Sequence, residues 1–344
     1  MNDKNTKIIN VYDNMLISLR GKNDTYECNT SDESNVIQRG RKFSSLYRGK
    51  RLSDNSYVCI KHLRDQDCIQ NEEHSHIIYT ILTSMAKLDE RIVQTYDIIH
   101  TNYGYFIVRE YLHGVDVKTI ICDPDYPALK TSAFACKVGI EVCSVLEKLH
   151  THGIIHRDIK PSNIFIETDD SGRISPENPK VRILDYEMAS VHGSNIFSLK
   201  KVPFALLYSA PEQVLRFAHL IDERSDIYSL ALVVYEIATR RPPFYHENPE
   251  MLINLQINHP IQKTPRISKE LYAILLQATS KHKFLLPPNK YSHEQLEQFL
   301  AQGKTNRYQN AQDFLEVLSA FYLQISQIKP KKSGNSFFSL FRKK

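Results

Sequence analysis

The chain has 344 residues, of which 42% are apolar, enough to bury a large core in one two-lobed domain or in two domains. Its 44 basic and 39 acidic residues leave a net charge of only +5, which does not indicate a nucleic-acid partner. The apolar runs are shorter than the roughly 18 residues that a membrane-spanning helix needs, so the sequence predicts a soluble protein.

The six cysteines include no CxxC pair, and the chain opens on the polar residues MNDKN instead of a basic and then apolar signal. Both features predict a reducing, cytoplasmic compartment and argue against a disulfide framework. Delivery into a host cell as a bacterial effector stays open as an alternative, because such proteins do not need a cleaved signal.

The first third of the chain carries strand signals. Residues 1–34 mix polar residues with a short apolar patch at 15–17 and show no clear period, so we expect an N-terminal extension. Short β-like runs follow at 43–48, 57–61 and 105–108, separated by turn-rich pieces. They predict a small antiparallel sheet.

Helical patterns follow in three places. One amphipathic helix is predicted by apolar residues at steps of three and four, namely Ile77, Ile78, Ile81, Leu82, Met85 and Leu88. A long buried helix is expected at 131–150, and a strongly apolar one runs to Ile237 after the polar start at Asp222. Two polar stretches, 168–180 and 281–304, are expected to be insertions.

The octapeptide HRDIKPSN at 156–163 carries the chemistry of phosphoryl transfer. Asp158 can accept the proton of an attacking hydroxyl, Lys160 can neutralise the moving phosphoryl group, and Asn163 can ligate Mg²⁺. On its own, the octapeptide is also compatible with a solvated turn between two apolar segments. The run resembles the catalytic loop of protein kinases.

This resemblance covers about residues 35–323 and implies an α+β, bilobal protein-kinase-like fold. A small antiparallel sheet with one regulatory helix would occupy 35–111, and a larger, mainly helical lobe 112–323. Residues 324–344 would form a basic and aromatic tail. The resemblance depends on the order of eight residues along the chain: Lys61, Asp158, Lys160, Asn163, Asp185, Glu212, Asp226 and Arg307.

The resemblance also implies an ATP site. Lys61, in the run VCIK, would hold the α- and β-phosphates, and alternation places Cys59 on the same strand face, where it would line the adenine pocket. Leu46 takes the position of the glycine-loop valine, and Phe165 that of the pocket floor. Adenine would bind the backbone of Glu110 and Leu112. Arg109 takes the gatekeeper position and would either fill the back pocket or reach the carboxylates.

Catalytic and supporting roles follow in the same way. Asp158 would orient a protein hydroxyl, while Asn163 and Asp185 would hold Mg²⁺ or Mn²⁺. Lys160 follows the serine/threonine pattern, so we expect a Ser/Thr kinase that acts on proteins and on itself. The supporting residues are His156, Arg157 as a binder of a phosphosite, Tyr186 as an aromatic plug, Asp226 beneath the catalytic loop, and the pair of Glu212 with Arg307.

Several positions depart from the family pattern. The glycine-loop positions hold Arg39, Arg41 and Ser44, Ala205 replaces a threonine, and Glu187 replaces the glycine of DFG, which predicts a restricted swing of this segment. The regulatory helix lacks a glutamate at the expected place, so Glu73 is the best available partner of Lys61, with Glu72 behind it. Candidate phosphosites in the activation loop are Ser190, Ser194 and Ser198.

These departures leave a second hypothesis open, a kinase-like scaffold with weak or no turnover. Phosphorylation of a small molecule is a third, which the run APE at 210–212 disfavours. In the tail, aromatic residues at 337–341 lie between basic ones, which suits weak membrane contact. An unrestrained or packed terminus is the preferred interpretation of the same segment.

Overall fold

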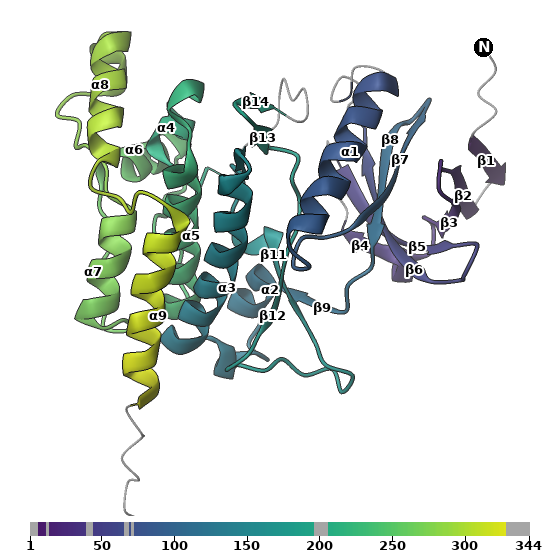
Figure 1. Cartoon of the computed structure of the whole chain (residues 1–344), viewed down its shortest axis with the longest axis horizontal. Coiled ribbons are helices and arrows are strands. Elements are labelled where there is room, and N and C mark those ends of the chain that lie inside the picture. The colour runs from purple at the N-terminus through teal and green to yellow at the C-terminus, as the bar shows by residue number, and fades with distance from the viewer. Residues whose placement is uncertain are drawn as a thin grey trace, which may run out of the picture.

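The computed structural model describes residues 6–11, 14–38, 44–64, 69, 72–195 and 206–327. Figure 1 shows most strands gathered in one half of the molecule and most helices in the other. The expected bilobal α+β fold is therefore confirmed. Part of the glycine loop (39–43), Ser198, Ala205 and the aromatic tail lie outside the described residues.

One antiparallel sheet forms the core of the small lobe. Its strands lie in the order β1-β2-β3-β5-β6-β8-β7, and β4 pairs with β5. This confirms the expected sheet and extends it towards the N-terminus. The strands are β1 (Thr6–Val11), β2 (Asn14–Arg20), β3 (Thr25–Asn29), β4 (Val36–Gln38), β5 (Ser44–Arg51), β6 (Tyr57–Leu63), β7 (Thr95–Thr101) and β8 (Gly104–Glu110).

The N-terminal extension adds strands to this sheet, which a segment without a clear period did not predict. β3 pairs with β5, and β2 pairs with β3. Ile17 and Leu19 in β2, with Tyr26 and Cys28 in β3, are buried in a second core formed with residues of β6, β7 and β8. Two short stretches of alternation, each of two apolar residues, carry this burial, and they are too brief to stand out in a polar segment.

Helix α1 (Glu72–Leu88) is the amphipathic helix that the sequence predicts. Its buried residues Ile78, Leu82 and Met85 belong to the main core, together with Leu63 and Ile107 of the sheet. Ile77 is exposed, because the buried stripe is narrower than the apolar pattern.

The large lobe is built on two buried helices. α3 (Ser132–Thr151) is capped by Thr131, whose side chain accepts a hydrogen bond from the backbone N–H of Phe134, and α5 (Glu223–Thr239) is capped by Asp222. Both were expected. The remaining helices are α2 (Val117–Cys122), α4 (Pro211–Val214), α6 (Pro249–Asn258), α7 (Lys269–Ala278), α8 (His293–Lys304) and α9 (Ala311–Gln327).

Short strands lie where the two lobes meet. β11 (Ile164–Glu167) pairs with both β9 (Gly114–Asp116) and β12 (Lys180–Ile183), and β10 (Ile154–Ile155) pairs with β13 (Ser190–Val191), which pairs with β14 (Ser194–Asn195). The first of these small sheets places residues 156–163 beside Asp185. Residues 156–163 come directly before β11, and Asp185 comes just after β12, the strand that pairs with β11.

The two expected insertions differ in structure. Residues 168–179 form a loop between β11 and β12. The stretch 281–304 ends in α8 and forms a small separate core, in which Phe284 and Leu300 pack with Phe217. Among the described residues, no helix is long and apolar enough to cross a membrane.

Candidate active site

A cleft of about 610 Å³ collects side chains from both lobes. Strands of the small lobe and the loops around residues 156–163 and 185 face each other across it. The predicted site residues that line it are Leu46, Cys59, Lys61, Arg109, Glu110, Leu112, Asp158, Lys160, Asn163, Phe165 and Asp185. One cavity thus brings together residues that the sequence predicted to bind ATP and a metal ion.

Strand pairing explains how Lys61 reaches this cleft. In the register of β6 with its neighbours, Lys61 lies opposite Leu46 of β5 and Ile107 of β8. Cys59 is two residues earlier on β6 and lies opposite Arg109. Since alternate residues of a strand share a face, Cys59 and Lys61 both line the cleft, as predicted.

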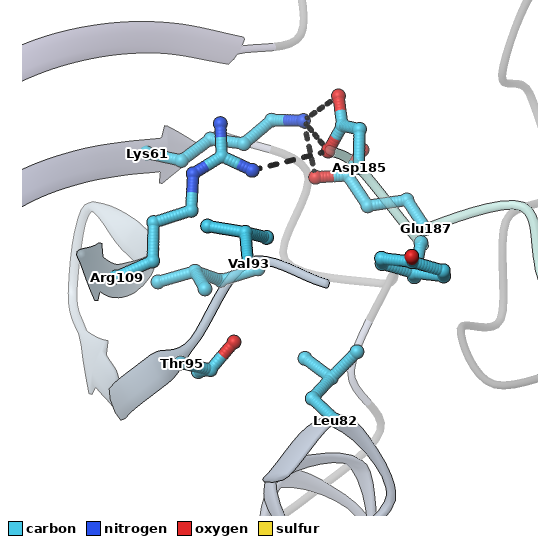
Figure 2. Close-up of a pocket in the computed structure, with 9 residues that line it drawn as sticks. Lys61, Leu82, Val93, Thr95, Arg109, Asp185 and Glu187 are labelled. Atoms are coloured by element: carbon cyan, nitrogen blue, oxygen red, sulfur yellow. Dashed lines mark hydrogen bonds and ion pairs between the residues drawn. The ribbon is translucent and has the colours of Figure 1, made fainter. Parts of the chain in front are cut away.

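Lys61 is buried between two carboxylates. Its ammonium lies 2.6 and 2.7 Å from the carboxylate oxygens of Asp185 and 2.6 Å from Oε1 of Glu187. Figure 2 shows this group, with Arg109 extending from the neighbouring strand toward the same carboxylate of Asp185. Burial alone would lower the pKa of Lys61, but Asp185 and Glu187 outweigh it and raise the pKa above the usual value.

Asp185 stays charged, while the affinity of Glu187 for a proton increases. Burial by itself raises the pKa of Asp185, but the charges of Lys61 and Arg109 hold it well below its usual range. Burial, and then the charge of Asp185, raise the pKa of Glu187. The site therefore keeps a negative charge at Asp185 at neutral pH.

The residues of the catalytic octapeptide contact one another directly. The ammonium of Lys160 lies 2.6 Å from Oδ2 of Asp158, and Nδ2 of Asn163 donates to the same oxygen at 2.9 Å and to the backbone oxygen of Asp158 at 2.9 Å. A hydroxyl that approached Asp158 would therefore meet an acceptor oxygen with a cation beside it.

Asp226 holds this loop from beneath. It accepts hydrogen bonds from the backbone N–H groups of His156 and Arg157, both at 2.8 Å, and its Oδ2 lies 2.9 Å from Nε2 of His150. Burial would raise its pKa, but His150 and the other donors hold the pKa of Asp226 below the usual value. Arg157 has a φ of 65°, so the loop needs these bonds to keep its shape.

The oxygen donors in the cleft fit a divalent cation. Nδ2 of Asn163 is used on Asp158, which leaves the amide oxygen of Asn163 as a ligand beside the carboxylates of Asp158 and Asp185. Such oxygen donors suit Mg²⁺ or Mn²⁺. Among the described residues, no group of three or more His, Cys, Asp or Glu side chains could hold a metal by itself. Phosphate oxygens are the further ligands that Mg²⁺ commonly takes beside one or two carboxylates.

Residues 34–318 match the family model of the protein kinase domain. The chain belongs to the protein kinase family.

The chain is similar to several curated bacterial proteins. It is 32% identical over 193 residues to the serine/threonine-protein kinase PknB of Mycolicibacterium smegmatis. The matched region covers 54% of this chain and 28% of PknB. It is 30% identical over 257 residues to the probable serine/threonine-protein kinase CPE1738 of Clostridium perfringens, and this match covers 72% of this chain and 34% of CPE1738. It is 26% identical over 306 residues to the serine/threonine-protein kinase Pkn1 of Myxococcus xanthus, and this match covers 84% of this chain and 38% of Pkn1. The match thus spans about a third of the length of these relatives.

The expectation that Glu73 pairs with Lys61 is wrong for this kinase. Glu73 is exposed at the start of α1, whereas the ammonium of Lys61 is buried against Asp185 and Glu187. The side chain that α1 contributes to the cavity beside Lys61 is the apolar Leu82. Periodicity places Glu73 on the apolar face of the helix, but this first turn of α1 is exposed to solvent.

Arg109 satisfies both alternatives that the sequence left open. It lines a small cavity of about 20 Å³ behind the cleft as well as the cleft itself. Its Nη1 also lies 3.8 Å from Oδ1 of Asp185. The kinase therefore carries two cations, Lys61 and Arg109, against the two carboxylates Asp185 and Glu187.

Of the candidate phosphosites, Ser190 does not suit modification in this arrangement, because it is fully buried in β13. Ser194 is exposed in the following turn and remains a candidate. Tyr186 is buried, and its ring lies 4.7 Å from that of His156, in keeping with the expected aromatic plug.

Sequence reasoning missed three contributors to the site. Glu187 was noted only as a replacement for glycine, although a carboxylate two residues after Asp185 was a signal that it could share the same cation. His150 binds Asp226. Arg182 contacts the side chain of Glu110 and lies 2.8 Å from Oε1 of Glu167. Neither His150 nor Arg182 stands out in the sequence, because their partners are far away along the chain.

Proposed function

We propose that this chain is a serine/threonine protein kinase that transfers the γ-phosphoryl group of ATP, bound with Mg²⁺ or Mn²⁺, to protein hydroxyls and to itself. The observation that carries the proposal is the convergence of Lys61, Asp158, Asn163 and Asp185 on one cleft. These residues come from both lobes and supply the charges that phosphoryl transfer uses.

Each side chain has a distinct task in this proposal. Lys61 binds the phosphates of the nucleotide, and Asn163 and Asp185 hold the metal ion, which neutralises phosphate charge when it is bound. Asp158 accepts a hydrogen bond from the substrate hydroxyl, aligns it and takes its proton. Lys160, 2.6 Å from Asp158, lies where it can stabilise the transferring group.

Two observations favour serine and threonine as acceptors. Lys160 stands two residues after Asp158, in the pattern of Ser/Thr kinases, and the curated relatives are described as serine/threonine-protein kinases. Protein substrates and a cytoplasmic place of action belong to the same proposal and derive from the resemblance and the composition.

The alternative of a scaffold without turnover has less support. The five side chains that would carry the chemistry, Lys61, Asp158, Lys160, Asn163 and Asp185, line one cavity. The departures in the glycine loop bear on nucleotide affinity more than on the chemical step.

The test is phosphoryl transfer by the purified full chain. It would be incubated with γ-labelled ATP, Mg²⁺ or Mn²⁺ and a generic basic protein, followed by phosphoamino-acid analysis. We expect label on serine and threonine, and a loss of about 10²- to 10⁴-fold in rate for Asp158→Asn, the range for a positioned acid or base.

The matched control is Glu73→Gln, which removes an exposed carboxylate and should leave the rate unchanged. Equal thermal midpoints of the three proteins would show that Asp158→Asn is folded. Failure of the wild-type protein to transfer label with either metal ion would refute the kinase proposal, and label on tyrosine alone would refute its specificity.

A further inference from the structure

Lys61 takes its carboxylate partners from the large lobe. Its side chain is only 5% exposed, and an ammonium buried to this degree needs a nearby negative charge. Asp185 and Glu187 supply that charge. Helix α1 of the small lobe contributes Leu82 to the surrounding cavity, and its Glu73 is exposed.

The two carboxylates are not equivalent in the proposed reaction. Asp185 would hold the metal ion, and a carboxylate engaged with Mg²⁺ is less available to Lys61. Glu187 would then be the acidic group that remains beside the ammonium, 2.6 Å away in this arrangement. Its distance is as short as that of Asp185, so no rearrangement of Lys61 is needed to reach it.

The backbone around Glu187 is anchored in the large lobe. Tyr186 is buried against His156, and the backbone N–H of Ala189 donates to the carbonyl oxygen of Tyr186 at 3.1 Å in a tight turn. Ala189 is itself fully buried. Glu187 is therefore presented from a fixed segment, although its carboxylate reaches across the cleft to strand β6.

We propose that Glu187 is the positioning residue of Lys61, and that it takes the task that the exposed Glu73 of α1 does not perform. The inference depends on the proposed kinase function and deepens it. It implies that Lys61 is oriented by the segment after Asp185 and not by α1. Closure of the two lobes, which brings β6 to Glu187, would then be the step that sets Lys61 for the phosphates.

Charge balance in the cluster predicts how a variant behaves. Lys61 and Arg109 face Asp185 and Glu187, so the cluster is neutral when all four groups are charged. Glu187→Gln keeps the size of the side chain but leaves two cations on Asp185 alone. Asp185 would be held more tightly by Lys61 and would bind the metal ion and nucleotide less readily.

The experiment measures nucleotide affinity and turnover separately. Binding of Mg·ATP would be followed by displacement of a fluorescent ATP analogue, and KM for ATP and kcat by transfer to a basic protein. We expect Glu187→Gln to raise both Kd and KM for ATP about tenfold or more, the effect of losing one contact to a charged group. Glu187→Asp keeps the charge on a shorter side chain and should recover part of the loss.

Two further variants separate positioning from a general structural effect. Glu73→Gln, the matched glutamate on α1, should bind ATP as the wild type does. In a Lys61→Met background, Glu187→Gln should have little additional effect on Kd, because its partner is gone. Thermal midpoints would confirm that each variant is folded.

The proposal is overturned if Glu187→Gln binds ATP as tightly as the wild type, if Glu73→Gln weakens binding equally, or if the effects of Lys61→Met and Glu187→Gln simply add. Failure of the kinase function has a different signature. A wild-type protein that binds Mg·ATP but transfers no label would refute the kinase activity, while the binding comparison would still decide the role of Glu187.

Discussion

Glu212 and Arg307 form a fully buried ion pair between residues 95 positions apart in the sequence. The guanidinium donates to the two carboxylate oxygens at 2.7 and 3.1 Å. Ser225 also donates to Glu212, at 2.7 Å, and Nε of Arg307 donates to the carbonyl oxygen of Ser280 at 2.8 Å. The pair thus joins the start of α4, the start of α5 and the segment before α9.

Arg307→Ala should lower the free energy of unfolding by about 3–5 kcal/mol, because it leaves the carboxylate of Glu212 buried without its cation. Denaturant unfolding would measure the loss. Arg241→Ala, at an exposed arginine of the same lobe, is the matched control and should change stability by less than about 0.5 kcal/mol. Equal losses for the two variants would contradict a stabilising pair.

The same pair predicts a pH dependence. Burial by itself raises the pKa of Glu212, but Arg307 and Ser225 hold it below the usual value of a glutamate. Its contribution to stability is therefore fully present above the pKa of the unfolded chain and is lost as pH falls through the lower pKa of the folded state. Arg307→Ala removes this cause, so the difference in unfolding free energy between wild type and variant should shrink as pH falls below about 4.5. A constant difference between pH 7 and pH 3.5 would contradict the prediction.

Asp97 ties the N-terminal strands to the rest of the small lobe. This buried carboxylate accepts from the backbone N–H groups of Lys22 and Asn23 at 3.0 and 3.2 Å, and from the hydroxyl of Tyr26 at 2.7 Å. Asp97→Ala should lower the free energy of unfolding by about 3 kcal/mol or more, because it leaves several donors without an acceptor. Tyr26→Phe removes a single hydrogen bond and should lower it by about 1 kcal/mol.

Hydrogen exchange of residues 21–26 would locate the effect, and denaturant unfolding would give its size. Asp54→Ala, at an exposed aspartate that accepts from the backbone of Ser56, is the control. If Asp97→Ala cost no more than Asp54→Ala, the loop would not be held by this carboxylate.

Arg109 of β8 is one of the side chains that line both the large cleft and the small cavity. Arg109→Ala should join the two spaces and admit an ATP analogue with a bulky group on adenine. We expect such an analogue to bind the variant roughly tenfold more tightly than the wild type, a typical gain for added apolar contact in a pocket. Competition with a fluorescent nucleotide would measure it, with unmodified ATP as the reference. An analogue that binds both proteins alike would refute the prediction.

The sequence alone determined the family, the bilobal fold and the cleft residues around Asp158, because these follow from short motifs and from their order along the chain. Asp158, Lys160 and Asn163 lie within one octapeptide, so their mutual distances follow from a short loop. Helices α3 and α5 carry long apolar patterns, which only a buried helix explains.

Only the tertiary structure decided which distant groups meet. Lys61 and Asp185 are 124 residues apart, and the choice of Glu187 over Glu73 as the second partner depends on how the lobes close and which face of α1 turns outward. The burial of Ser190 and the place of β2 and β3 in the sheet have the same origin. Local patterns specify which elements form, whereas the pairing of charges and of short strands is set by packing between segments that the sequence keeps far apart.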